Sequence, residues 1–68
     1  MIYTVIISSS NNGFDDLTST VVMVTINEQL AINYANELMD NKSILIDFIN
    51  VNEWTSETES TQILSLTL

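Results

Sequence analysis

The alternation of apolar and polar positions predicts two strands at the start of the chain. Residues 2–8 are β-branched or aromatic at most positions, and residues 18–25 (TSTVVMVT) form a second run of the same kind. The polar segment between them, residues 8–16, contains the only glycine, Gly13, next to Asn12, which is typical of a turn. We therefore expect the two runs to pair as an antiparallel hairpin.

A helix is predicted next, because the apolar spacing changes to the helical period. Thr25 and Glu28 fit a capping box with Thr25 as the N-cap, and Asn27 is an alternative N-cap. The helix is expected to end at Asn41, with Lys42 where a cation suits the helix dipole. The apolar residues on its inner side, within an arc of roughly 140°, are Leu30, Ala31, Tyr34, Ala35 and Leu38.

Two further strands are predicted in the second half of the chain. Residues 43–51 (SILIDFINV) are rich in strand-forming residues, and residues 62–68 alternate in polarity. In the first of these runs, Ile44, Ile46 and Phe48 would share one face and Leu45, Asp47, Ile49 and Val51 the other. Residues 52–61 are polar and acidic and are expected to form a loop. The order β-β-α-β-β predicts an α+β fold, a small sheet with one helix packed on one face, in a single acidic domain over residues 1–68.

The first and third predicted strands carry apolar side chains on nearly both faces. Ile2 and Ile6 alternate with Tyr3, Val5 and Ile7, although a sheet covered by one helix should be polar on its other face. Apolar surface without an internal cover marks an interaction site. We therefore expect a homodimer, or docking of a partner, through the open sheet face or an edge strand. The alternative is that the C-terminal segment folds over the open face and enlarges the core.

The charge of the chain limits its partners. Nine acidic residues face one basic residue, Lys42, and the formal net charge is −8. Nucleic-acid binding requires Lys or Arg to neutralise phosphates, so direct binding of nucleic acid is excluded, and so is attraction to an anionic membrane surface. An acidic surface instead attracts a basic one, such as a protein that handles DNA or RNA. The alternative is that the acidity serves solubility alone.

The residues needed for common catalytic chemistry are missing. The chain has no His and no Cys, which excludes an imidazole base, a thiolate nucleophile and an ordinary transition-metal site. One glycine does not make a Gly-rich phosphate loop. The segment Asn11–Asp16 has oxygen-bearing side chains but lacks the ligand spacing and the closing Glu of an EF-hand calcium loop. We expect no enzyme, no metal and no cofactor.

No targeting segment is apparent in the sequence. The apolar start of the chain, residues 1–7, has no basic flank, and no run approaches the ~20 apolar residues of a membrane span. We therefore expect a cytoplasmic protein.

Candidate partner-binding residues surround the single tryptophan and the outer side of the helix. Trp54 lies in an acidic stretch, where an aromatic anchor is typical of an interface hot spot; the alternative is a lid over one end of the core. If the segment around Glu57 and Glu59 is extended, the two side chains project on the same side ~6–7 Å apart, which suits a basic groove. An ordinary charged surface is the alternative. The predicted partner-binding residues are Glu37, Asp40, Glu53, Trp54, Glu57 and Glu59.

The segment 24–38 (VTINEQLAINYANEL), preceded by a hairpin and followed by a strand, resembles small phage-encoded inhibitor proteins. In those proteins a β-hairpin leads into a short helix that carries an alanine and then an aromatic residue, followed by a returning strand. The resemblance spans roughly residues 2–51 and carries over no functional residue. It implies an inhibitor of host defence or of a host enzyme, such as an anti-CRISPR protein, acting in the cytoplasm of the host cell.

The predicted function is therefore a non-enzymatic inhibitor that uses its acidic surface to block a basic nucleic-acid-binding protein. Two alternatives stay open. One is a homo-oligomeric structural or assembly module, and the other is an antitoxin-like neutraliser of a toxin.

Overall fold

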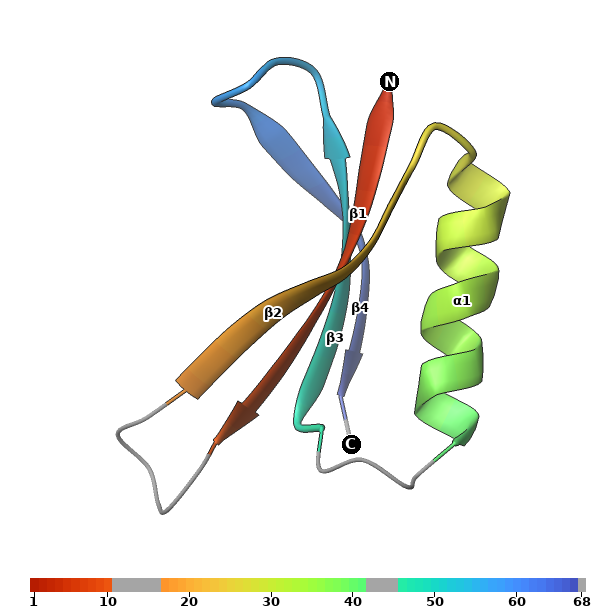
Figure 1. Cartoon of the computed structure of the whole chain (residues 1–68), viewed down its shortest axis with the longest axis vertical. Helices are drawn as coiled ribbons and strands as arrows, with labels where there is room; N and C mark the ends of the chain where they lie inside the picture. Colours follow the sequence, from red (N-terminus) through yellow and green to blue (C-terminus); the bar gives the residue numbers. More distant parts are fainter. Residues whose placement is uncertain (11–16, 42–45, 68) are drawn as a thin grey trace.

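The strand-like runs and the helical repeat of the sequence fold into one antiparallel sheet and one helix. The computed structural model describes residues 1–10, 17–41 and 46–67. Within these ranges the elements are β1 (Ile2–Ser10), β2 (Leu17–Thr25), α1 (Glu28–Asp40), β3 (Phe48–Trp54) and β4 (Ser60–Thr67). The sheet has four strands in the order β2-β1-β3-β4, and α1 lies along one of its faces (Figure 1). The predicted α+β fold with the order β-β-α-β-β is confirmed.

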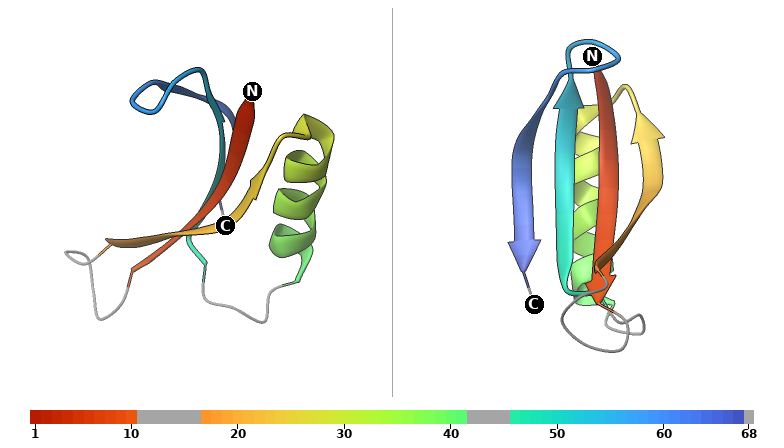
Figure 2. Two further views of the ribbon diagram at one scale, coloured as in Figure 1. Left: turned by 45° about the horizontal axis from the view of Figure 1, so that its top comes forward. Right: turned by 90° about the vertical axis from the view of Figure 1, so that its left-hand side faces the viewer.

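Each edge strand contains a bulge within its pairing with the neighbouring central strand. The β1–β2 register shifts between Val5 and Ile6, and the β3–β4 register shifts between Val51 and Asn52. A bulge bends the strand that carries it and increases the local twist. In Figures 1 and 2 the ends of both hairpins accordingly curve away from α1.

The helix begins at a different cap from the one the capping box indicates. The Oδ1 of Asn27 accepts a hydrogen bond from the Leu30 N–H at 3.1 Å, which makes Asn27 the N-cap. Thr25 remains in β2, paired with Tyr3, and its Oγ1 accepts from the Asn27 N–H at 3.1 Å. Thr25 as N-cap is therefore wrong and the alternative, Asn27, is right. The predicted C-cap, Asn41, is confirmed by its N–H bond to the Glu37 carbonyl at 2.9 Å.

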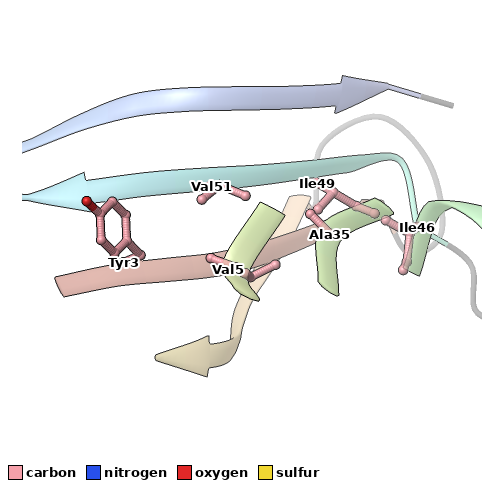
Figure 3. Packing of buried hydrophobic residues seen from close by; sticks show 7 residues of the cluster. Tyr3, Val5, Ala35, Ile46, Ile49 and Val51 are labelled. Atoms are coloured by element: carbon pink, nitrogen blue, oxygen red, sulfur yellow. The ribbon is translucent and has the colours of Figure 1, made fainter. Parts of the chain in front are cut away.

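The hydrophobic core lies between α1 and the two central strands (Figure 3). Because α1 contributes two alanines, its backbone comes close to the sheet. Leu30, predicted on the inner side, is 48% exposed. The inner stripe is centred on the alanines, and at ~100° per residue Leu30 points ~120° away from that centre. The buried apolar residues are Tyr3, Val5, Ala31, Ala35, Ile46, Ile49 and Val51.

Strand β3 starts later and ends later than the pattern predicts. Ile46 is buried before the strand begins, whereas Phe48 is 38% exposed, so the prediction that these two share a face is wrong. A bend at Asp47 separates them, and the Asp47 N–H donates to the Ser8 carbonyl at 2.9 Å. The segment 52–61, predicted as a loop, supplies the end of β3 and the start of β4. Ile44 and Leu45 lie outside the described residues.

The C-terminal segment forms β4 at the edge of the sheet. Leu64 and Leu66 pair with Val51 and Ile49 and pack against the core from the helix side. The alternative in which this segment folds over the open face is therefore wrong. Figure 2 shows the sheet from the side opposite α1, and no described element covers that side. No helix among the described residues is long and apolar enough to span a membrane.

Candidate protein-binding face

On the side of the sheet opposite α1, which we call the open face, the paired strand residues carry no charge. Residues paired across an antiparallel sheet project to the same side, so the register assigns each side chain to a face. Among the strand residues that this register pairs, no Asp, Glu, Lys or Arg projects from the open face. Its residues are Ile2, Thr4, Ile6, Ser8, Ser19, Val21, Val24, Phe48, Asn50, Asn52, Trp54, Ser60, Gln62, Ser65 and Thr67.

Several large apolar side chains on the open face are exposed to solvent. Val24 is 64% exposed, and Ile2, Val21 and Phe48 are exposed as well. Between them, the Ser8 and Ser19 hydroxyls form a hydrogen bond to each other at 2.9 Å. Since these apolar groups have no cover within the described chain, the face has the composition of an interaction surface.

Trp54 is fixed on the open face by a hydrogen bond across the sheet. Its Nε1–H donates to the Oγ1 of Thr4 at 2.9 Å, and Thr4 is buried. Trp54 pairs with Ile2 as the last residue of β3, so its assignment to a loop is wrong. The ring lies on the side opposite the core and does not act as a lid over it. The long-range pairing with β1 holds the residue in a strand despite its polar surroundings.

A pocket of about 500 Å³ opens beside Trp54 at this end of the sheet. Its walls come from the start of β1, the end of β3 and the turn that follows, and its one charged side chain is Glu57. The lining residues are Met1, Ile2, Thr4, Trp54, Thr55, Ser56 and Glu57. The open face therefore combines a broad uncharged surface with a pocket that has an aromatic and an acidic side chain.

The turn between β3 and β4 is closed by its own hydrogen bonds. The Thr55 N–H donates to the Glu59 carbonyl at 3.0 Å, and the Ser56 Oγ accepts from the N–H groups of Thr58 and Glu59 at 3.3 and 3.1 Å. The segment with Glu57 and Glu59 is thus a turn, and the extended geometry predicted for the two side chains is wrong. Both remain exposed.

Glu53 projects to the helix side, away from the open face. The Tyr3 hydroxyl donates to its Oε2 at 3.1 Å, and Tyr3 is buried in the core cluster. Burial raises the pKa of Tyr3, and the hydrogen bond to Glu53 and the charges of Glu53 and Glu28 raise it further. Glu53 therefore has a partner within the fold.

The two acidic residues predicted for partner binding on the helix lie far from this pocket. Glu37 and Asp40 are exposed in the last turn of α1, at the opposite end of the molecule from the β3–β4 turn (Figure 1). Of the predicted partner-binding residues, only Trp54 and Glu57 line the same pocket. The structure adds Ile2 and Thr4, which sequence reasoning missed because their proximity to Trp54 depends on the β1–β3 pairing. The alternation of apolar residues in β1 was the available signal for Ile2.

The segment Asn11–Asp16, considered above for calcium binding, lies outside the described residues. Among residues 1–10, 17–41 and 46–67, no group of three or more acidic side chains is placed to hold a metal ion. Comparison of the chain with protein-family models, with curated proteins and with solved structures gives no match. The residues and geometry of the open face are therefore the basis on which a function can be inferred.

Proposed function

We propose that the protein is a non-enzymatic binding protein that inhibits a basic nucleic-acid-handling protein by docking on it through the open face. The observation that carries this proposal is an uncharged, partly apolar face in a chain of net charge −8. Protein interfaces are depleted of charge at their centre and polar at their rim. The open face fits the centre, and the acidic turn at Glu57 and Glu59 fits the rim.

Charge supplies the choice of partner in this proposal. A strongly acidic chain attracts a basic protein over long range and speeds their encounter. An acidic protein docked beside a groove that normally binds phosphates would repel those phosphates and so prevent nucleic acid from entering. The resemblance of the segment 24–38 to phage-encoded inhibitors supports host defence proteins and host nucleic-acid enzymes as candidate partners.

Capture followed by competition tests this function. The tagged protein is incubated with bacterial lysate, captured material is eluted with salt, and each eluted protein is purified and assayed for nucleic-acid binding. We expect a basic protein whose nucleic-acid binding is lost when the acidic protein is added. A captured partner that binds nucleic acid equally well in its presence would contradict inhibition.

A homo-oligomeric module is a second candidate, and the composition of the sheet edges favours it. The edge strands β2 and β4 contain no charged residue and no proline, the usual protections against strand pairing. Two copies can therefore pair edge to edge without placing like charges opposite each other. Light scattering over a concentration series tests this: a dimer that Ser65→Lys in β4 converts to monomer supports the module, and a monomer at all concentrations rejects it.

A further inference from the structure

We infer that the pocket beside Trp54 receives an arginine side chain of the partner. This inference rests on the proposed function and specifies its anchor point. The pocket lies where the first residues of β1 meet the β3–β4 turn, and its volume of about 500 Å³ falls within the range of small-ligand sites, about 300–1,000 Å³. A side chain of the partner, rather than a large surface, fits a site of this size.

The aromatic side chain that lines the pocket has no free donor. The indole N–H of Trp54 already donates to Thr4 at 2.9 Å, so it is not available to a ligand acceptor. The same bond fixes the ring orientation before any partner arrives. A fixed indole whose donor is occupied binds best through its π face, and guanidinium groups stack on such faces.

The apolar walls suit the aliphatic stem of a long basic side chain. Met1 and Ile2 line the pocket and are exposed, so contact with methylene groups would remove part of their apolar surface from water. Arginine combines such a stem with a charged planar head. A short polar side chain would leave these walls without contact.

The carboxylate of Glu57 supplies the charge that selects a cation. It is the one charged side chain among the lining residues, and the hydrogen bonds of Ser56 hold the turn that carries it. A carboxylate pairs with a guanidinium through two parallel hydrogen bonds, a geometry that a lysine ammonium does not match. The net charge of −8 disfavours an anionic ligand at the same place. Stacking surface, apolar wall and carboxylate together fit arginine.

Trp54 is the only tryptophan of the chain, so its fluorescence reports on this pocket alone. The probes are a capped Gly-Arg-Gly peptide and its citrulline counterpart, which has the same shape without the charge. We expect a saturable fluorescence change with the arginine peptide and a weaker one with the citrulline peptide. Glu57→Gln should weaken binding of the arginine peptide about two- to fivefold, the range of an exposed ion pair. Glu28→Gln, an equal change of charge on the helix side of the sheet and outside the pocket, should leave binding unchanged.

Three results would overturn the inference. Equal binding of both peptides would indicate a merely apolar pocket, and equal losses in the two variants would indicate diffuse charge attraction. Absence of any saturable fluorescence change would show that the pocket takes no such side chain. A negative peptide titration would not by itself reject the proposed function, because that function is tested separately by capture of a basic partner and inhibition of its nucleic-acid binding.

Discussion

The Tyr3 hydroxyl donates a hydrogen bond to the Glu53 carboxylate at 3.1 Å between directly paired positions of β1 and β3. Both side chains lie on the side of the sheet that faces α1, where Tyr3 is buried in the core. Glu53 belongs to the acidic set that the sequence suggests for partner binding, yet its carboxylate is engaged within the fold. The remaining acids near Trp54, Glu57 and Glu59, lie in the exposed turn.

The Tyr3–Glu53 contact predicts a loss of stability in alkaline solution. The pKa of Tyr3 is raised in the folded state above its ordinary value of 10.0, through burial first and Glu53 second. The stability that the protonated Tyr3 hydroxyl gives the folded state is therefore fully present below the unfolded-state pKa. It is lost as pH rises through the higher folded-state pKa. Denaturant unfolding above pH 10 should show the free energy of unfolding falling with pH.

Tyr3→Phe should remove most of this alkaline slope and should also lower stability at neutral pH, because the hydrogen bond to Glu53 is lost. Glu53→Gln keeps an acceptor but removes the charge, so it should reduce the slope without abolishing it. A Tyr3→Phe protein with the wild-type slope would show that another group causes the alkaline loss.

The close approach of α1 to the sheet predicts intolerance of a larger side chain at Ala35. This residue is fully buried on the inner stripe of the helix, so Ala35→Leu should overpack the core and cost about 1–3 kcal/mol. Asn36→Leu places the same side chain on the exposed side of α1 and should change stability little. Urea unfolding of the two variants measures the difference. Equal stabilities would mean that the helix does not pack closely on the sheet.

The N-cap assignment predicts a difference between two neighbouring polar residues. Asn27→Ala should cost about 1 kcal/mol, because the Leu30 N–H loses its acceptor. Asn27→Asp retains an acceptor and should restore most of the stability. Thr25→Ala removes only the bond to the Asn27 N–H and should cost less. Unfolding curves in which Thr25→Ala is the more damaging change would restore Thr25 as the cap.

The hydrogen bond between Trp54 and Thr4 predicts energetic coupling across β1 and β3. Trp54→Phe leaves the Thr4 hydroxyl without this donor, and Thr4→Val removes the acceptor. Both substitutions remove the same hydrogen bond, so each should cost less stability when the other is already present. A double-mutant cycle of unfolding free energies should therefore give a coupling of about 0.5 kcal/mol or more. Strict additivity of the two single changes would show that the bond contributes nothing to stability.

The elements of the fold follow from local pattern, whereas their boundaries depend on distant partners. The period change near Asn27 is a local signal and predicts the helix well. Trp54 stands in a polar, acidic stretch, so nothing local reveals that it ends β3; its pairing with Ile2 does. The face assignment near Phe48 fails because the bend at Asp47 interrupts the alternation.

The site was only partly predictable for the same reason. An aromatic residue beside acids drew attention to Trp54 and Glu57, and both line the pocket. Ile2 and Thr4 complete it from the other end of the chain, because β1 and β3 are neighbours in the sheet. The number of acidic residues in the sequence could not show that none of them projects from the paired strands of the open face. That separation of charge from apolar surface appears only when the register is known.

The central claim, that a partner docks on the open face, is tested most directly by one pair of variants. Val24→Asp places a charge within the open face, and Asn36→Asp places an equal charge on the exposed side of α1. Affinity for the captured basic partner is measured at low and high salt, after circular dichroism confirms that both variants fold. We predict that Val24→Asp weakens binding about tenfold or more, as expected for a buried unpaired charge, and that Asn36→Asp does not. Equal affinities of the two variants at both salt concentrations would contradict docking through the open face.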